Sequence, residues 1–326
     1  MTRYFVFNGD ADGLCALQQL RLAEPGPAML VTGVKRDIAL LSRVSASRGD
    51  EVTVLDVSLD VNREGLLQAL AAGASVRYFD HHFAGEVPES EALETQIDPS
   101  PDVCTSLLVD RALRGRHCTW AVTGAFGDGL DEVANSIAAR SGKSPAEART
   151  LKELGVAINY NAYGDTIADL RVPPAELAER LEGFADPLEF AATSPIFREL
   201  VSGYHDDMQK VGTLRPMKRT PGALCFVLPE EAWARRASGT VANDLARAHA
   251  GAAVAILSRN SQGNYTVSLR VPADARVSAD AFCRQFPTGG GRRTAAGINQ
   301  LPEARCDDFF RAFEQQFNAT IPPGSS

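Results

Sequence analysis

The sequence has 326 residues, of which 44% are hydrophobic and 23% are charged, proportions typical of a globular protein. Its formal net charge is -8 at pH 7, the opposite sign from that of proteins that hold long duplex DNA through many phosphates. We therefore expect a small or short substrate and no long duplex DNA. No apolar run approaches the ~20 residues of a membrane span, and the first residues lack the plan of a signal peptide. These features predict a cytoplasmic protein that does not bind membranes.

Length and pattern predict two domains. Between residues 4 and about 80, short apolar runs alternate with helical patterns, which predicts an α/β domain built on a parallel sheet. A smaller α/β domain is predicted from about residue 220. The six cysteines include no Cys-x-x-Cys pair, so we expect buried, reduced thiols rather than a zinc or redox site.

The chain opens with a predicted strand over residues 4–7, and an acidic turn follows it directly. The turn reads Asn8-Gly9-Asp10-Ala11-Asp12-Gly13, and an amphipathic helix comes after it. This order places Asp10 and Asp12 at a helix N-terminus, where anions and phosphates gain from the helix dipole.

A second strand is predicted over 28–34, and it ends in Lys35, Arg36 and Asp37. Lys35 and Arg36 are expected either in a solvated turn or beside a substrate phosphate, because they lie at the same end of the predicted sheet as the acids. Asp37 is predicted to cap a helix over 38–44.

Three later apolar runs, over 52–55, 74–79 and 122–127, are predicted to be strands, and each leads into residues that can bind metals. These residues are Asp56 after the first run, Asp80-His81-His82 after the second, and Asp128 after the third. Open parallel sheets bind ligands at the carboxyl ends of their strands. Carboxylates with some imidazole suit Mn²⁺ or Mg²⁺, or a pair of such ions if a carboxylate bridges them. We therefore predict a metal site, and the alternative is a set of isolated caps and turns.

Between these runs the sequence predicts connecting structure. Asp60 is expected to cap a helix that ends at Leu70. The stretch 84–101 is rich in Pro and Glu and is expected to be a surface loop. Thr105 and Ser106 open a further helix, either as its cap or as residues near the site.

Residues 144–215 are predicted to be mostly helical. The stretch 159–164 is polar and aromatic, and it is expected to be a buried helix end or to pack over a nucleobase. The segment 205–207, with the sequence His-Asp-Asp, is expected to lie on an exposed helix face rather than to bind a metal.

The second domain contains a glycine cluster next to basic residues. Its predicted strands cover 223–228, 252–257 and 265–269, and its predicted helices cover 240–248, 278–286 and 302–317. The cluster, Gly289-Gly290-Gly291, precedes Arg292 and Arg293. Successive glycine N–H groups can face an anion, and arginines add charge-assisted donors. We expect a phosphate or nucleotide site there, and the alternative is a flexible turn with solvated arginines.

The ordered motifs resemble those of the DHH phosphoesterase superfamily. They are Asp10-x-Asp12-Gly13, a lone Asp56, Asp80-His81-His82 and the later Gly127-Asp128. The stretch 289–297 is similar to the glycine-rich signature of the associated DHHA1 domain. We therefore expect a DHH catalytic domain over 1–195, a helical linker over 196–219, a DHHA1 domain over 220–318 and a disordered tail over 319–326.

The resemblance also implies roles at two Mn²⁺ ions, for which Mg²⁺ or Co²⁺ could substitute. The implied ligands are Asp10 and Asn8 for the first ion, Asp12, His81 and Asp128 for the second, and Asp56 as a bridge between them. Asp80 would orient an imidazole, and His82 would contact the scissile phosphate or a metal. Arg270 and Arg292, with the glycine motif, would hold another phosphate or terminal group of the substrate.

The chain departs from the family pattern in the first motif and in the glycine motif. Many members carry a histidine where this chain has Val6, and RecJ-like members carry an acid where it has Asn8, whose amide adds no negative charge. Arg292 replaces the histidine of the glycine motif. An arginine cannot give up a proton at neutral pH, but it binds phosphate bidentately.

The resemblance implies an enzyme that uses metal-activated water to hydrolyse phosphodiester or phosphomonoester bonds of short oligonucleotides or small nucleotides. One alternative is a non-catalytic nucleotide sensor, which Asn8 and Arg292 favour. Another is an inorganic pyrophosphatase or polyphosphatase, although those relatives carry a different C-terminal domain. The sequence leaves a homodimer open.

Overall fold

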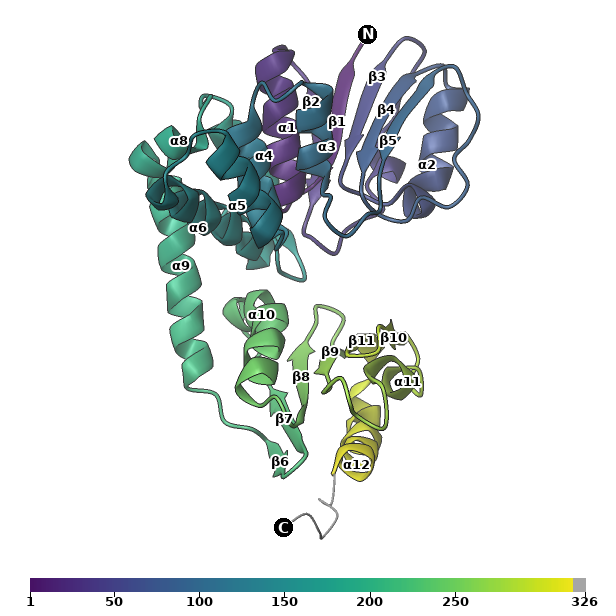
Figure 1. Ribbon diagram of the computed structural model, residues 1–326. Helices are drawn as coiled ribbons and strands as arrows, with labels where there is room; N and C mark the ends of the chain where they lie inside the picture. The colour runs from purple at the N-terminus through teal and green to yellow at the C-terminus, as the bar shows by residue number, and fades with distance from the viewer. Residues whose placement is uncertain (319–326) are drawn as a thin grey trace. The chain divides into compact units, whose positions relative to one another are not determined.

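The chain forms two compact units, shown in the computed structural model of Figure 1. The structure describes residues 1–318, so the predicted disordered tail lies outside the described residues. The first unit covers Met1–Tyr204, and the second starts at His205. The boundary falls inside helix α9 (Pro195–Gly212), within the stretch predicted as a linker. Both units are α/β, as predicted, and the parallel sheet lies in the first.

The first unit is built on a five-stranded parallel sheet with the strand order β2-β1-β3-β4-β5. The strands are β1 (Arg3–Asn8), β2 (Met29–Gly33), β3 (Glu51–Leu55), β4 (Ser75–Asp80) and β5 (Leu93–Ile97). Successive residues of a strand point to opposite faces. Phe5 and Phe7 therefore pack under α1 (Ala11–Ala23), whereas Tyr4 and Val6 pack on the face that α2 (Leu59–Ala71) covers (Figure 1).

Two aspartates predicted as helix caps have other roles. The stretch 38–44 holds only one turn of 3-10 helix, and Asp37 instead forms an ion pair with Arg43. Asp60 lies in the first turn of α2, whose N-cap is Ser58. Both predictions were wrong because capping residues look alike in a sequence, and only the backbone shows which of them starts a helix.

Two segments were predicted with the wrong secondary structure. The stretch 84–101 contains β5, which is the last strand of the sheet and partly exposed, so its sequence shows no apolar run. The run 122–127 belongs to a helix, α4, and is not a strand. This helix is buried all round, and periodicity cannot separate a fully buried helix segment from a buried strand.

Helices fill the rest of the first unit, and residues 144–215 are mostly helical, as predicted. The elements are η1 (Leu41–Arg43), α3 (Thr105–Ala112), α4 (Cys118–Gly127), α5 (Asp131–Arg140), α6 (Pro145–Asn161), η2 (Ile167–Asp169), α7 (Pro174–Leu181) and α8 (Pro187–Thr193). At Gly127, a Cβ atom would lie 2.3 Å from the Cβ of Ala11 and 2.8 Å from the carbonyl oxygen of Gly155. Only glycine permits this contact of α4 with α1 and α6, and the contact fixes the position of the next residue, Asp128.

The second unit is built on a six-stranded mixed sheet with the order β10-β11-β9-β8-β7-β6, in which only β7 and β8 are parallel neighbours. The strands are β6 (Lys218–Thr220), β7 (Ala223–Val227), β8 (Ala253–Arg259), β9 (Tyr265–Arg270), β10 (Gly289–Gly291) and β11 (Ala295–Leu301). The helices are α10 (Ala232–Ala248), α11 (Ala279–Cys283) and α12 (Cys306–Phe317), with η3 (Glu303–Arg305) before the last. One core forms between the sheet and α10, and another under α11 and α12.

Asp207 was predicted to be exposed with His205 and Asp206, but its side chain is fully buried. It accepts hydrogen bonds from Nε (2.8 Å) and Nη2 (3.1 Å) of Arg236 in α10. His205 and Asp206 are exposed, as predicted. Asp207 and Arg236 thus form a buried ion pair. A buried aspartate needs such a partner, because the ion pair offsets the hydration that the carboxylate loses.

Candidate metal centre

Acidic and imidazole side chains from four segments meet where the strands of the first sheet finish, here called the carboxyl end of the sheet. They are Asp10 and Asp12 after β1, Asp56 after β3, His81 and His82 after β4, and Asp128 after α4. The Nε2 atom of His81 lies 3.4 Å from Oδ1 of Asp56. It also lies 4.0 Å from Oδ2 of Asp12 and 3.9 Å from Oδ2 of Asp128. Neighbouring parallel strands end together, so the fold itself gathers these groups.

The first-motif aspartates are held by backbone N–H groups. Asp10 is the N-cap of α1, and its Oδ1 accepts hydrogen bonds from the N–H groups of Asp12 (3.0 Å) and Gly13 (3.1 Å). The two oxygens of Asp12 accept hydrogen bonds from the N–H groups of Thr105 and Ser106, each at 2.7 Å. The first turn of α3 therefore fixes Asp12 through its backbone, which the side chains in the sequence could not indicate.

Asp56 sits in an unusual backbone conformation directly after β3. Its φ is 58°, in the left-handed region, which aspartate and asparagine tolerate better than most residues. Its N–H donates to the carbonyl oxygen of Phe79 on the neighbouring strand (3.1 Å), and its Oδ1 accepts a hydrogen bond from Oγ1 of Thr105 (3.3 Å). The side chain is thereby turned into the centre, with only 2% of the residue exposed.

The two histidines are oriented by different partners. The Nδ1 atom of His81 lies 3.0 Å from the carbonyl oxygen of Val103 and must donate to it, so Nε2 keeps its lone pair for a metal. The Nδ1 atom of His82 lies 2.7 Å from Oδ1 of Asp80. Burial alone would lower the pKa of His82, but the hydrogen bond and charge of Asp80 outweigh it, so the pKa is raised.

The crowded carboxylates shift one another's pKa values. Burial, and then the charges of Asp10 and Asp12, raise the pKa of Asp56 well above its usual value. Burial, and then the same two charges, raise the pKa of Asp128 to about 7. Burial also acts on Asp10, but its ion pair with Lys35 outweighs burial and lowers the pKa of Asp10. The centre therefore holds more negative charge than its own basic groups balance, and a divalent cation would relieve this.

The residues present fit a hard divalent cation. Asp56, His81 and His82 form one set of ligand atoms within 4.8 Å of one another, and Asp12, His81 and Asp128 form another. Carboxylate oxygens with imidazole nitrogens are donors that suit Mn²⁺. The second oxygen of Asp80 is also buried without a hydrogen-bond partner among the described residues.

Lys35 was predicted either in a solvated turn or beside a substrate phosphate, and in the structure its ammonium group contacts Asp10 of the centre. Its Nζ forms an ion pair with Oδ2 of Asp10, donates to Oδ1 of Asn159 (3.0 Å) and lies 5.5 Å from the ring centre of Tyr163. Arg36, next to it, is exposed. Asn8 donates from Nδ2 to the carbonyl oxygen of Lys35 (3.4 Å), and its Oδ1 is buried without a partner among residues 1–318.

The residues predicted to hold another phosphate lie in the second unit. Arg270, at the end of β9, donates from Nε to Oδ1 of Asn243 (2.8 Å). The triple glycine was predicted as a phosphate or nucleotide site, with a flexible turn as the alternative, and it forms the strand β10, paired with β11. A Cβ at Gly289 would lie 1.8 Å from the carbonyl oxygen of Cys283, so packing alone already requires glycine there. β10 lies at the edge of the sheet, where outer backbone groups can meet a ligand, and Arg292 and Arg293 are exposed.

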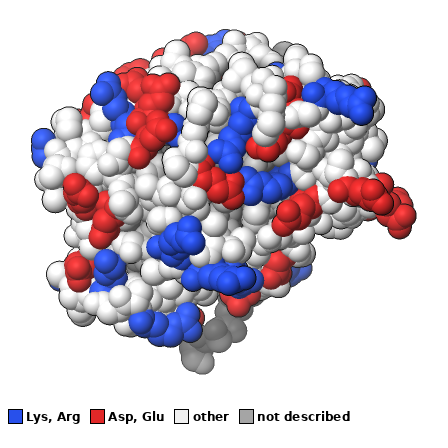
Figure 2. Space-filling view, turned by 90° about the horizontal axis from the view of Figure 1, so that it is seen from above, with Lys and Arg blue, Asp and Glu red and all other residues white. Residues whose placement is uncertain are grey.

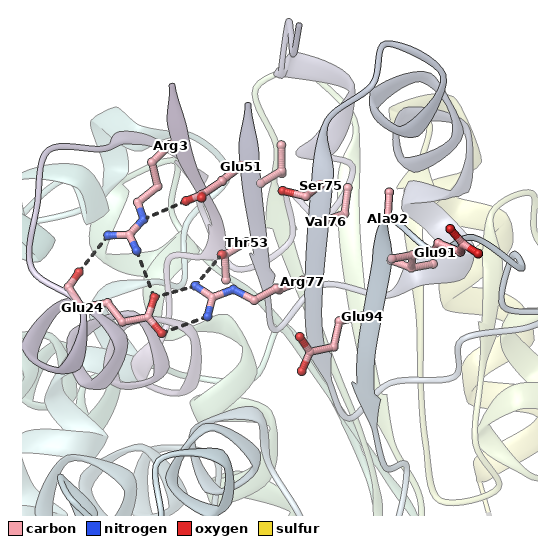
Figure 3. Close-up of a pocket in the computed structure, with 12 residues that line it drawn as sticks. Arg3, Glu24, Glu51, Thr53, Ser75, Val76, Arg77, Glu91, Ala92 and Glu94 are labelled. Carbon is pink, nitrogen blue, oxygen red and sulfur yellow. Dashed lines mark hydrogen bonds and ion pairs between the residues drawn. The ribbon is translucent and has the colours of Figure 1, made fainter. Parts of the chain in front are cut away.

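A hollow of about 430 Å³ opens at the other end of the first sheet, where the strands begin, here called the amino end (Figure 3). Figure 3 shows Arg3 and Arg77 both directed at Glu24, which caps the end of α1. Arg77 binds both carboxylate oxygens of Glu24, at 3.0 and 2.9 Å, and Arg3 binds one of them at 2.9 Å. The two arginines of the hollow are thus paired with carboxylates, and Arg3 also forms an ion pair with Glu51 (3.7 Å).

Comparisons with known proteins identify the second unit first. Residues 221–319 match the family model of the DHHA1 domain. Among solved structures, exonuclease RecJ bound to manganese is 17% identical with a TM-score of 0.63, over 98% of this chain and 91% of that one. Residues 221–319 therefore form a DHHA1 domain, and the chain as a whole has a fold similar to that of RecJ. Both findings agree with the predicted resemblance.

Two further solved structures have a similar fold. RecJ from Thermus thermophilus, in complex with Mn²⁺, is 19% identical with a TM-score of 0.64, and the match covers 96% of this chain but 51% of that one. The pGpG-specific phosphodiesterase PggH from Vibrio cholerae is 15% identical with a TM-score of 0.56, over 98% of this chain and 99% of that one. No curated protein matches the sequence. Within residues 1–318, no helix has the length and apolar character needed to cross a membrane.

Proposed function

We propose that this DHH protein hydrolyses phosphodiester or phosphomonoester bonds of short oligonucleotides or small nucleotides, with Mn²⁺ as its metal. The observation that carries the proposal is the gathering of three carboxylates, those of Asp12, Asp56 and Asp128, around Nε2 of His81. Two proteins of the same fold are described as a manganese-bound exonuclease and a pGpG-specific phosphodiesterase, which supports this class of substrate.

The negative net charge of the chain supports a short substrate. The chain carries a net charge of -8, whereas binding to long nucleic acid gains from many basic contacts with phosphates. On the face drawn in Figure 2, acidic and basic side chains are interspersed and form no continuous basic tract. A few fixed arginines can still hold the phosphates of a short substrate.

The residues around His81 would have different roles in the reaction. Asp12, Asp56, Asp128 and His81 would hold the ion, which when bound lowers the pKa of water and neutralises charge on phosphoryl oxygens. Asp80 accepts a hydrogen bond from Nδ1 of His82 and raises its pKa. A protonated His82 can bind a phosphoryl oxygen or pass a proton to the leaving group from Nε2.

We further propose that Arg270, Arg292, Arg293 and the backbone of β10 bind a second phosphate or terminal group of the substrate. Arg292→Ala should then raise KM by roughly tenfold, the effect of losing one charged hydrogen bond of about 1.4 kcal/mol, with little change in kcat. Steady-state kinetics on the preferred substrate measure this, and an unchanged KM would remove Arg292 from the binding site.

A nucleotide sensor without catalysis is the second candidate. It is favoured by one observation, the ion pair between Lys35 and Asp10, which engages a carboxylate that the resemblance assigns to a metal. An inorganic pyrophosphatase or polyphosphatase is less well supported, because the DHHA1 match covers the glycine motif that such relatives lack.

The decisive experiment offers the purified protein Mn²⁺ and a panel of substrates. The panel contains a short RNA ladder, linear and cyclic dinucleotides, 3′-phosphoadenosine phosphate and pyrophosphate, and Asp56→Asn is the matched control. We expect release of mononucleotide or phosphate that depends on Mn²⁺ and is lost in the control. Turnover of pyrophosphate alone would support the pyrophosphatase. Tight nucleotide binding without turnover, also with Mg²⁺ and Co²⁺, would support the sensor.

A further inference from the structure

We propose that the ammonium group of Lys35 takes the place of one of the two ions that the family resemblance implies, so that this centre holds a single divalent ion. The inference rests on the proposed function, because it concerns the same metal centre. It assigns to Lys35 a structural role as a built-in cation instead of the predicted contact with substrate.

Both carboxylate oxygens of Asp10 already have partners. Oδ1 accepts two backbone hydrogen bonds, from Asp12 and Gly13, and so caps α1. Oδ2 forms the ion pair with Lys35. An ion bound by Asp10 would have to displace this ammonium group or share its oxygen with it, at a cost from repulsion between two cations.

The side chain and backbone of Lys35 are held by contacts from several sides. Its Nζ also donates to Oδ1 of Asn159 (3.0 Å) and lies over the ring of Tyr163. Its own N–H donates to the carbonyl oxygen of Ala162, which caps the C-terminus of α6 (2.9 Å). Helix C-termini favour a positive charge. Lys35 thus bridges the end of β2 and the end of α6, and it is not a mobile surface lysine.

Position 8 of this chain carries no negative charge. The resemblance places an acid there in RecJ-like members, but Asn8 carries no charge, and its Nδ2 supports the carbonyl oxygen of Lys35. Asp10 and Lys35 therefore balance each other one to one. A divalent ion in this half of the centre would find less negative charge than one placed beside Asp12 and Asp128.

The remaining candidate ligands all lie around His81. The two sets of ligand atoms found among the described residues both include His81, and neither includes Asp10. The Nδ1 atom of His81 is engaged with Val103, so the ring has only Nε2 to offer. One nitrogen lone pair coordinates one ion, and the two sets are therefore two sides of a single site.

The test counts ions without using activity. Protein freed of metal with EDTA is titrated with Mn²⁺ by calorimetry, and bound manganese is measured by mass spectrometry after desalting. We expect about one equivalent per chain for the wild type and about two for Lys35→Met combined with Asn8→Asp, which restores the acid. Electron paramagnetic resonance should show an isolated Mn²⁺ ion in the wild type and an exchange-coupled pair in the double variant.

Two matched variants protect the result against simple misfolding. Lys35→Arg keeps the charge and should still bind about one equivalent, and Arg36→Met removes the neighbouring exposed charge and should also bind about one. Thermal melting of each variant shows that it is folded. An exchange-coupled pair in the wild type would overturn the inference, and so would a single ion in the folded double variant.

Failure of this inference and failure of the proposed function give different results. A wild type that hydrolyses the panel but binds two ions would overturn the role of Lys35 and leave the enzyme in place. A wild type that binds one ion but hydrolyses nothing would support the role of Lys35 and remove the enzyme.

Discussion

The two ends of the parallel sheet in the first unit are both lined with charged residues, but they balance charge in different ways. At the amino end, Arg3 and Arg77 meet the carboxylate of Glu24, and the hydrogen bond from Arg77 lowers the pKa of Glu24. At the carboxyl end, buried carboxylates face one another, and the pKa values of Asp56 and Asp128 are raised. At the amino end Arg3 and Arg77 are paired by side chains of the protein itself, whereas at the carboxyl end we propose that an added cation offsets the remaining negative charge.

The difference follows from where a parallel sheet places its loops. The starts of β1 and β4 bring Arg3 and Arg77 next to the end of α1, so that opposite charges can pair across short distances. The ends of β1, β3 and β4 bring like charges together, which costs stability unless a ligand compensates for it. Perturbed pKa values cluster at functional sites, which supports the proposal that the carboxyl end is the functional end.

Asp56→Asn should have the largest effect, since it removes a charge from the carboxyl end and keeps a residue that tolerates a φ of 58°. Turnover should fall by more than roughly 100-fold, the cost that loss of even an outer partner of a metal ligand can reach. Stabilisation by Mn²⁺ should be largely lost. The metal-free variant should be more stable than metal-free wild type at pH 7, because the raised pKa of Asp56 means that its charged form is disfavoured in the folded state.

Turnover and melting with and without Mn²⁺ measure these effects. Glu24→Gln, at the amino end, is the control and should leave turnover unchanged. Normal turnover in Asp56→Asn would contradict the assignment of the metal centre. A metal-free variant less stable than metal-free wild type would show that the charges of the carboxyl end are balanced without a cation.

How much of this comparison the sequence reveals depends on how local each interaction is. Asp56 directly follows an apolar run, and Asp10, Asp12 and His81 lie a few residues beyond one, so their gathering could be predicted from the ends of the predicted strands. The structure adds their exact supports, which come from backbone atoms of Thr105 and other residues that a sequence pattern does not distinguish.

Interactions across long stretches of chain were not predictable. The partner of Lys35 in α6, Asn159, is 124 residues away, and the partner of Asp207, Arg236, lies in a different helix. The strand β5 was missed because it is partly exposed and lacks an apolar run. In each case the sequence shows the chemical type of the residue but not the element that packs against it.

The stability of the metal-free protein should depend on pH through Asp128, whose pKa is raised from an ordinary 3.8 to about 7 by burial and then by Asp12 and Asp10. Because the folded pKa is the higher one, protonated Asp128 favours the folded state. This contribution is fully present below about pH 4 and is lost as the pH rises through about 7. The effect is at most a few kcal/mol, at about 1.4 kcal/mol for each pKa unit.

Melting temperatures of EDTA-treated wild type and Asp128→Asn across this pH range isolate the contribution, and the variant should vary less. Affinity for Mn²⁺ should change in the opposite direction and rise with pH, because a carboxylate must lose its proton to bind a metal. Parallel curves for the two proteins would place Asp128 outside the charged cluster.

Glu24→Gln should give the smallest effect and shows how little the balanced end depends on one charge. Its carboxylate is partly exposed, so solvent screens its ion pairs, and we expect a loss of about 0.5 kcal/mol. The pKa of Glu24 is lowered in the folded state, by the hydrogen bond from Arg77 above all. Its contribution is therefore present above its ordinary pKa of 4.5 and is lost as the pH falls through the lowered value. Urea unfolding should separate wild type and variant at pH 7 and bring them together in acid. A gain in stability would mean that the amino end, too, holds a charge that its neighbours do not balance.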